Sequence, residues 1–456
     1  MRSAYTSRGL LRGSREILAA IDGILGLEPE IAALLADGAR DRLIVVKPNW
    51  VQESHQHQKE VWEPVITNPA VLVCLLECLA KRILGNATIC VCDAPHTYAN
   101  FGEILGRGKF GERLSDFSTR HPNIRFELLD LRRETWVTKE DVVIERRPNP
   151  EDPRGYVIAN LGAESLFYEH PGEGRYYGAD YDSAVVNSHH HGTTQEYLVA
   201  NTPIACDLFI NVPKMKTHKK TGITCCLKNL VGINGDKNWL PHHSESSSAF
   251  RGDEFPVASF RNRVEFNTKR IGKSVALKTP VLGPWIYRKM RNLGKEILGD
   301  SETVVRNGNW SGNDTCWRMA LDLNRALLYA NSDGTWRDRD HPKTYLAIVD
   351  GITGGQGNGP LCPDPVQSNV LVSGTNPAEV DAVVSKLMGF NPCQIPIVRS
   401  AFDAHCWPIA TKPMGSISVF DGRVGHELDL DGIAPAVTGG FVPHFGWSNL
   451  RAATGT

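Results

Sequence analysis

Short runs of β-branched residues that end in polar turn residues, with a helical pattern after them, constrain the fold of this chain most. Arg42–Val46 (RLIVV) runs into Lys47-Pro48-Asn49. Pro69–Leu84 has apolar residues at helical spacing, and Ala87–Cys92 (ATICVC) then reads as a strand that runs into Asp93. This alternation is typical of βαβ units, in which parallel strands are covered by helices.

The same rhythm continues further along the chain. The pattern predicts strands over Leu208–Val212, Tyr345–Val349 and Asn369–Val372, and helices over Gly222–Val231 and Ala378–Met388. We therefore expect an α/β fold with a largely parallel, helix-covered sheet. In such folds the loops after the strands carry the functional site.

Residues 236–340 break this rhythm. Between Arg261 and Lys295 there are ten Lys or Arg residues and one acidic residue, Glu265, with Trp285 and Tyr287 among them. We expect a discontinuous α/β domain over 1–235 and 341–456, and a basic, partly helical insertion or cap over 236–340. A solvated pair of basic helices is the simplest interpretation of 261–295. The alternatives are a docking surface for an anionic polymer or a segment that lies on an acidic membrane surface.

Composition excludes several classes of protein. The 456 residues carry a formal net charge of −1, which does not favour a nucleic-acid-binding polycation. The first 26 residues lack the unbroken apolar region of a secretory signal, and no uncharged apolar run approaches membrane-spanning length. The 11 cysteines include no C-x-x-C pair, so the sequence contains no local iron–sulfur or zinc-ribbon motif. We expect reduced core cysteines in a cytoplasmic protein.

Familiar nucleotide and hydrolase motifs are also missing or misplaced. Gly106–Gly111 matches G-x-G-x-x-G, but it follows no β-run and no helix clearly begins within it, as dinucleotide binding would require. The chain has no P-loop and no G-x-S-x-G sequence.

The densest polar segment extends from Asn211 to Asn229. Cationic, hydroxyl and amide groups gather there beside an apolar strand, at Lys214, Lys216, Thr217, Thr224, Lys228 and Asn229. With the free amides of a helix start, these groups suit a phosphate or carboxylate. If the segment is helical, Lys228 lies on the same face as Thr224, four residues earlier. A solvated loop with its lysine tips in water is the alternative.

Further polar residues follow other predicted strands. Lys47 and Asn49 follow the first, and Asn376 follows the last. Gly357 belongs to a glycine-rich loop, Gly354–Pro360, whose backbone could approach an anion closely. An ordinary flexible turn is the alternative for that loop. We include all four residues in the predicted substrate-binding set.

Histidines near the basic segment raise the question of a metal. His218, His242 and His243, together with Asp350 or Asp93, have the ligand types that zinc, iron or manganese use. No fixed ligand spacing supports such a site, so a divalent metal and plain acid–base chemistry by histidine both stay open.

The polar segments resemble a poorly characterised family, the domain of unknown function 362 (DUF362). The resemblance is carried by VVKPNW, CDAP, INVPKMKTHKKTGITCCLKNLVGI, VDGITGGQGNGP and SGTNPAEVDAVVSKLMGFNP, in that order, over residues 42–236 and 344–401. It implies an α/β domain and no particular reaction. Many relatives carry a ferredoxin-like cluster motif that this sequence lacks, so electron transfer is not carried over.

Two hypotheses follow. In the first, the protein is an enzyme for a small anionic substrate, with His218, Asp93, Asp350 and Lys228 as catalytic groups. In the second, it is a non-catalytic accessory protein that binds an anionic polymer or lipid head group through 261–295. The sequence does not decide the substrate, the reaction, the metal or the oligomeric state.

Overall fold

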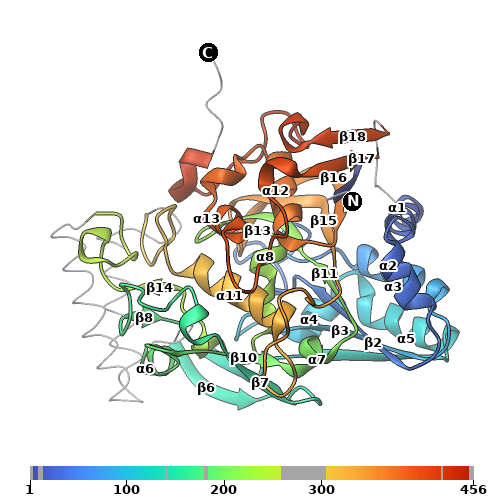
Figure 1. The fold of residues 1–456 in the computed structure, drawn as a ribbon, viewed down its shortest axis with the longest axis horizontal. Helices are drawn as coiled ribbons and strands as arrows, with labels where there is room; N and C mark the ends of the chain where they lie inside the picture. Colours follow the sequence, from blue (N-terminus) through green and yellow to red (C-terminus); the bar gives the residue numbers. More distant parts are fainter. Residues whose placement is uncertain are drawn as a thin grey trace.

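The fold is taken from a computed structural model, which describes residues 4–8, 14–139, 142–178, 183–257, 304–422 and 425–450. Within these residues an 11-stranded sheet forms the middle of the molecule (Figure 1). Its main path runs β18-β17-β1-β16-β15-β11-β2-β3-β4, and β12 and β13 extend from β15. Its strands are β1 (Ala4–Arg8), β2 (Arg42–Pro48), β3 (Ala87–Asp93), β4 (Ile124–Asp130), β11 (Leu208–Val212), β12 (Lys214–His218), β13 (Gly222–Thr224), β15 (Tyr345–Asn358), β16 (Cys362–Gly374), β17 (Ser418–Asp421) and β18 (His426–Asp429).

The centre of this sheet is parallel. Strand β2 pairs in parallel with β3 and β11, β3 with β4, and β15 with both β11 and β12. Neighbouring residues of β2 face opposite sides, and both sides are buried: Ile44 and Val46 belong to one core, and Val45 to the other. Strands buried on both faces read as continuous apolar runs. The predicted α/β fold with a largely parallel, helix-covered sheet is thereby confirmed.

Helices cover both faces of the sheet. One core is formed with α1, α2, α3, α4 and α5, which gather on one side of Figure 1, and the other with α8, α11, α12 and α13. The helices are α1 (Ser14–Gly26), α2 (Pro29–Ala36), α3 (Pro69–Arg82), α4 (Phe101–Gly106), α5 (Phe110–Arg120), α6 (Ala184–Ser188), α7 (Asn201–Ala205), α8 (Cys226–Asn229), α11 (Cys316–Tyr329), α12 (Pro377–Leu387) and α13 (Pro396–Arg399). No helix of the described residues is long and apolar enough to cross a membrane.

Smaller strand groups flank the main sheet. They pair in the orders β7-β10-β9, β5-β6 and β8-β14. Their bounds are β5 (Glu134–Lys139), β6 (Val142–Pro148), β7 (Tyr156–Asn160), β8 (Tyr176–Tyr177), β9 (His190–His191), β10 (Thr194–Ala200) and β14 (His243–Ser244). Tyr177 of β8 and His243 of β14 line the site described below.

The helix predicted over Gly222–Val231 is wrong in its first part. Gly222 begins β13, with a φ of 81° that glycine adopts readily, and β13 pairs with β12 as a hairpin. Helix α8 begins only at Cys226, where the Asp381 carboxylate accepts the Cys226 and Leu227 amides. The chain continues as a 3₁₀ turn, η3 (Leu230–Ile233).

The glycine-rich segment is not the loop that the sequence indicated. Strand β15 continues to Asn358 and returns as β16. A Cβ atom at Gly355 would lie 2.8 Å from the Pro64 carbonyl oxygen, and one at Gly359 would lie 1.9 Å from that of Thr217. These glycines therefore allow close packing of β15 and its turn against neighbouring backbone.

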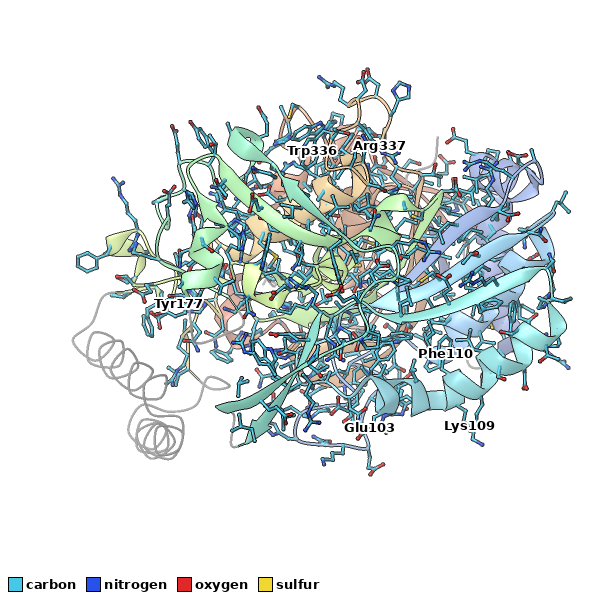
Figure 2. The ribbon with its side chains drawn as sticks, turned by 90° about the horizontal axis from the view of Figure 1, so that it is seen from below. Glu103, Lys109, Phe110, Tyr177, Trp336 and Arg337 are labelled. Atoms are coloured by element: carbon cyan, nitrogen blue, oxygen red, sulfur yellow. The ribbon has the colours of Figure 1, made fainter. Side chains whose placement is uncertain are left out.

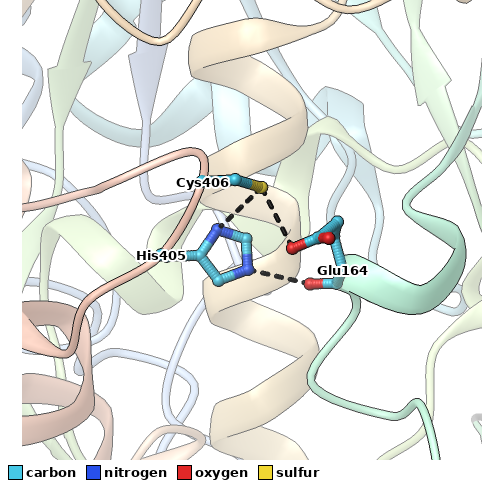
Figure 3. A group of neighbouring side chains, drawn as sticks. All are labelled: Glu164, His405 and Cys406. Carbon is cyan, nitrogen blue, oxygen red and sulfur yellow. Dashed lines mark hydrogen bonds between the residues drawn. The ribbon is translucent and has the colours of Figure 1, made fainter.

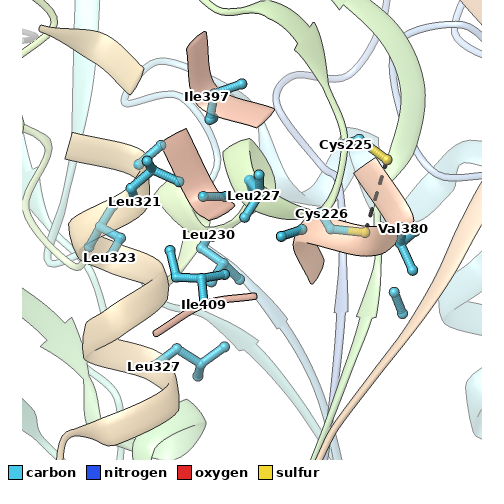
Figure 4. Close-up of a cluster of buried hydrophobic side chains, with 14 of the residues drawn as sticks. Cys225, Cys226, Leu227, Leu230, Leu321, Leu323, Leu327, Val380, Ile397 and Ile409 are labelled. Atoms are coloured by element: carbon cyan, nitrogen blue, oxygen red, sulfur yellow. Dashed lines mark hydrogen bonds between the residues drawn. The ribbon is translucent and has the colours of Figure 1, made fainter. Parts of the chain in front are cut away.

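The segment predicted as an insertion, 236–340, is partly described. Its helix α11 contributes Leu321, Leu323 and Leu327 to the main core beside α8 (Figure 4). The basic stretch 261–295 lies outside the described residues, and so does its proposed contact with an anionic polymer or membrane.

Candidate functional site

A cavity of about 470 Å³ opens at the carboxyl ends of the central strands, the position expected for a site in an α/β sheet. Asn49 reaches it from the end of β2, Asp93 from β3, His218 from β12 and Lys228 from α8. Its basic side chains are Lys216, Lys219, Lys220, Lys228, Lys237 and Arg306. Asp93 and Glu254 are its acidic residues, so its wall carries an excess of cationic groups.

The Asp93 carboxylate is held as part of the cavity wall. Its Oδ1 accepts a hydrogen bond from Lys47 Nζ at 2.8 Å, and its Oδ2 accepts the Trp50 amide at 2.7 Å. Lys47 is fully buried and also donates to Asn229 Oδ1. A Cβ atom on Gly232 would lie 1.9 Å from Asp93 Oδ1, so only glycine leaves this ion pair room. The pair neutralises Asp93 within the wall.

Helix α8 presents polar groups to the cavity because its apolar residues are anchored on the other side. Leu227 and Leu230 pack among core side chains of α11 and α13 (Figure 4). Lys228 faces the cavity and is 8% exposed, yet its Nζ forms no hydrogen bond or ion pair with any described residue. Thr224 Oγ1 and Asn49 Oδ1, also in the cavity wall, are buried without a partner among the described residues. Lys228, Thr224 and Asn49 thus line the same cavity.

Burial lowers the pKa of the cavity lysines, because desolvation disfavours the ammonium form. The pKa of Lys237 falls to about 7 and that of Lys220 to about 8. The pKa of Lys216 falls well below its usual value through burial and through the nearby Lys214 and Lys228. Its Nζ donates to the Val65 carbonyl at 2.5 Å. An anion in this space would offset these shifts, because it stabilises the ammonium form.

Two cavity histidines are neutral and have opposite tautomers. Burial and the nearby Lys228 hold the pKa of His218 and of His242 well below its ordinary value. His218 Nδ1 accepts the Lys220 amide at 3.1 Å, so its proton is on Nε2. His242 Nδ1 lies 2.8 Å from the Leu240 carbonyl oxygen, to which it must donate, so its Nε2 carries a lone pair. The cavity therefore contains one neutral imidazole that can donate a hydrogen bond, His218, and one that can accept a proton, His242.

The structure brings together most of the residues selected from sequence, but not all. Nine line the cavity: Asn49, Asp93, Lys216, His218, Thr224, Lys228, Asn229, His242 and His243. Six lie elsewhere: Lys47, Lys214, Thr217, Asp350, Gly357 and Asn376.

The six residues outside the lining have identifiable contacts. Lys214 and Asp350 form a fully buried ion pair at 2.7 Å, and Asp350 also accepts the Asn68 amide. Thr217 donates its hydroxyl to the Gly357 carbonyl at 3.0 Å. The remaining side chain of this group, Asn376, caps the first turn of α12. These contacts support the framework around the cavity.

Other lining residues were not selected from the sequence. Lys220 lies within the basic segment that the sequence highlighted, so its position could have been inferred. Tyr177, whose ring stacks on His243 with centroids 5.3 Å apart, and Arg306 come from distant segments without a motif. Figure 2 shows Tyr177 well apart from Lys109 in the G-x-G-x-x-G match. Helix α5 begins at Phe110 within that match, where the sequence indicated no helix start, but the match follows α4 rather than a strand.

The predicted metal ligands do not form one compact set. Asp350 does not line the cavity that His218, His242 and His243 share. Among the described residues, three potential ligand atoms lie within 4.8 Å of one another at two other places. One is the buried group Cys225, Cys226 and Asp381, and the other is the accessible group Glu164, His405 and Cys406.

Comparison with known proteins identifies a family but no function. The family model described as "Domain of unknown function (DUF362)" matches residues 108–386, more than half of the chain. No curated protein matches. One solved structure that matches is a structural-genomics target from Thermotoga maritima, with 12% sequence identity and a TM-score of 0.30. The alignment covers 79% of this chain and 55% of that chain, so this chain spans about half of that protein.

Proposed function

The chain belongs to the DUF362 family, and from its cavity we propose that it is an enzyme acting on a small anion with phosphate or carboxylate groups. The observation that carries the proposal is the pair of unpartnered donors, Lys228 Nζ and Thr224 Oγ1, in a wall rich in basic side chains. Burial lowers the pKa of Lys228, because its amine has no counter-charge among the described residues, and a bound anion would supply that charge. The volume of about 470 Å³ suits a small molecule.

We assign each group a role on the basis of its contacts. Lys228 and Thr224 bind the anion, and Asn49 Oδ1 accepts a hydroxyl or amino group of the same molecule. His242 Nε2 accepts a proton from the substrate and becomes the imidazolium, and His218 Nε2–H donates a hydrogen bond to the oxygen on which negative charge develops. Both imidazoles are neutral before the step, as these two roles require. Proton transfer on an anionic substrate is the reaction type that this arrangement supports.

Binding of simple anions tests the first half of the proposal. We expect orthophosphate, pyrophosphate or citrate to raise the Tm of the full chain, because a ligand at 100 times its Kd stabilises a fold by about 2.7 kcal/mol. Lys228→Met should remove the shift without lowering the Tm of the free protein. Lys81→Met, at an exposed lysine on α3, is the matched control and should retain it. Equal anion affinity in K228M and wild type would disprove the assignment.

Turnover tests the second half. Once a binding anion class is found, phosphate esters or hydroxy acids of that class can be incubated with the protein and followed by phosphorus and proton NMR. We expect His242→Gln and His218→Gln to bind the anion within about threefold of wild type and to lose turnover by 100-fold or more, the range typical of a lost general base or of a lost hydrogen-bond donor to developing charge. If both variants retain turnover, these histidines are not the catalytic groups, and only the anion-binding half of the proposal remains.

We also propose that the protein works in a reducing compartment such as the cytoplasm. All 11 cysteines are free thiols and nine are buried, as core cysteines of reduced proteins are. The alternative function through residues 261–295 stays a prediction, because that stretch lies outside the described residues.

A further inference from the structure

A second constellation of reactive side chains lies apart from the cavity lining. Glu164 ends the 3₁₀ turn η2 (Gly162–Glu164), and His405 and Cys406 lie in the loop after α13, about 240 residues later (Figure 3). Cys406 Sγ lies 3.1 Å from Glu164 Oε2 and 3.7 Å from His405 Nδ1. The side chains of Glu164 and Cys406 are exposed and that of His405 is partly exposed, so solvent ions can reach all three.

These distances suit the edges of a metal coordination sphere. Zinc–sulfur bonds of about 2.3 Å and zinc–nitrogen or zinc–oxygen bonds of about 2.0 Å place tetrahedral ligand atoms about 3.5 Å apart. His405 and Cys406 are neighbours in sequence, and neighbouring side chains of an extended segment point to opposite faces. Here, instead, His405 Nδ1 and Cys406 Sγ lie close together, 3.7 Å apart. Thiolate, imidazole and carboxylate together are a donor set that zinc prefers.

The orientation of His405 also fits a ligand. Its Nε2–H donates to the Glu164 backbone carbonyl at 2.8 Å, which leaves the lone pair on Nδ1, the nitrogen nearest Cys406. A ligating histidine usually donates its second nitrogen to a carbonyl or carboxylate in this way. Nδ1 also accepts the Trp407 amide at 2.9 Å. Metal binding would replace that single neutral hydrogen bond by a stronger metal–nitrogen bond.

Both segments are fixed to the same helix, α11. Asp322 on α11 accepts the Ser165 hydroxyl at 2.6 Å and the Leu166 amide at 3.2 Å, directly after Glu164. Tyr329, about two turns further along the same face of α11, donates its hydroxyl to the Pro408 carbonyl at 2.7 Å. The Trp407 ring stacks on Trp336, with centroids 4.1 Å apart. The ligands are therefore held near one another before any ion arrives, which reduces the entropy lost on binding.

We propose that Glu164, His405 and Cys406 form a zinc site in which solvent occupies the fourth position. On binding, the Cys406 thiol releases its proton to solvent and the thiolate, the imidazole and one carboxylate oxygen bond to Zn²⁺. The two negative ligands balance the charge of the ion. The ion joins the η2 turn to the loop after α13 and so links two segments distant in sequence.

Metal titration of the full chain tests this site. We expect chelator-treated protein to bind one equivalent of Zn²⁺ in calorimetry and to show a thiolate-to-metal charge-transfer band with Co²⁺. Loss of a residue that only hydrogen-bonds a metal ligand weakens metal affinity by about 10–100-fold. Loss of a ligand itself, in Cys406→Ser or His405→Gln, should therefore weaken zinc affinity by about 100-fold or more. Cys393→Ser is the matched control, because Cys393 is the other exposed thiol.

Each alternative result has a clear meaning. Circular dichroism of C406S should match wild type, because the side chain is exposed. If the charge-transfer band disappears in C393S instead, or if C406S binds zinc as wild type does, the site is not at Cys406. Zinc binding that survives C406S but is lost in His242→Gln would place the ion in the lysine-rich cavity and overturn the proposal.

Discussion

At the scale of single residues, the lysines in and around the cavity differ in how their amines are accommodated. Lys47 and Lys214, outside the cavity lining, each contact a carboxylate, Asp93 and Asp350 respectively. Among the described residues, Lys237 Nζ donates to backbone carbonyls, and burial lowers its pKa to about 7. Lys47 and Lys214 thus have a counter-charge, whereas Lys237 changes its charge near neutral pH. The response of the cavity to an anion should therefore depend on pH.

Anion binding at pH 8 should take up protons. At this pH free Lys237, with a pKa near 7, is mostly neutral, and Lys220, with a pKa near 8, is about half neutral. A bound anion favours the ammonium form and raises both pKa values, so protons enter with the ligand. Calorimetry with pyrophosphate in buffers of different ionisation enthalpy measures this uptake. We expect a positive value that falls in Lys237→Met; release of protons would contradict the assignment.

The sequence identified the basic segment but not the direction of each side chain. Lys214 and Lys216 stand two residues apart, and in a regular strand they would share one face. The pairing of β12 with β15 shifts register between them, and Lys214 enters an ion pair while Lys216 lines the cavity. A local irregularity of this kind arises from the close approach of two distant strands, which no single-strand pattern contains.

At the scale of elements, residues with local signals were predictable. Strands β2 and β3 and helices α3 and α12 were expected nearly where they lie, because their apolar spacing and their Asn-Pro starts are local signals. The β15–β16 hairpin was not expected, because its glycines are also typical of loops. Their use in close packing depends on Thr217 and Pro64, which are distant in sequence.

The capping role of Asn376 gives a prediction that distinguishes a structural role of this residue from a role in anion binding. Its side chain accepts the Ala378 and Glu379 amides at the start of α12. Asn376→Ala should lower the free energy of unfolding by about 1 kcal/mol, as loss of an N-cap does, and leave anion affinity unchanged. Denaturant unfolding and the anion titration measure the two effects. A loss of affinity without a loss of stability would return Asn376 to the binding set.

The turn η3 should tolerate no side chain at Gly232. A Cβ atom there would lie 1.9 Å from Asp93 Oδ1 and 2.5 Å from Lys47 Nζ. Gly232→Ala should cost about 3 kcal/mol, because it disturbs a buried ion pair, and should weaken anion binding. Gly23→Ala is the control: nothing lies within 4 Å of that position on α1, and alanine should stabilise the helix by about 0.5–1 kcal/mol. Equal stability of the two variants would contradict this packing.

At the scale of the whole molecule, the chain buries several histidines that must stay neutral. Burial is the main cause of the low pKa of each, with nearby cations adding to it for those in the cavity. The pKa is about 3 for His96 and about 4 for His190 and His444, and it is well below the ordinary value for His218 and His242. The unfolded chain binds protons at these positions near pH 6.5, and the folded chain does not.

The fold should therefore be labile to acid. A histidine with a depressed pKa contributes stability above pH 6.5 and loses it as the pH falls towards the folded value. Between pH 7 and 5 each such histidine loses about 2 kcal/mol, so five of them approach the whole net stability of a typical protein, about 5–15 kcal/mol. Asp381, whose pKa burial raises to about 6, opposes this trend, as do Asp322 and Glu28, whose pKa values burial also raises.

Urea unfolding at a series of pH values measures the effect. The slope of the free energy of unfolding against pH gives the number of protons taken up on unfolding, and near pH 5 we expect several.

The variant His444→Asn tests one of these histidines. It keeps an acceptor for the Gly446 amide, which His444 Nδ1 now accepts at 3.1 Å, but removes the titrating ring. The slope should then fall by about 1 kcal/mol per pH unit, since one proton fewer is bound. His191→Asn, at an exposed position, should leave the slope unchanged. A wild-type slope near zero at pH 5 would mean that these histidines are already charged in the folded protein, and the neutral imidazole pair assigned to the cavity would fail with them.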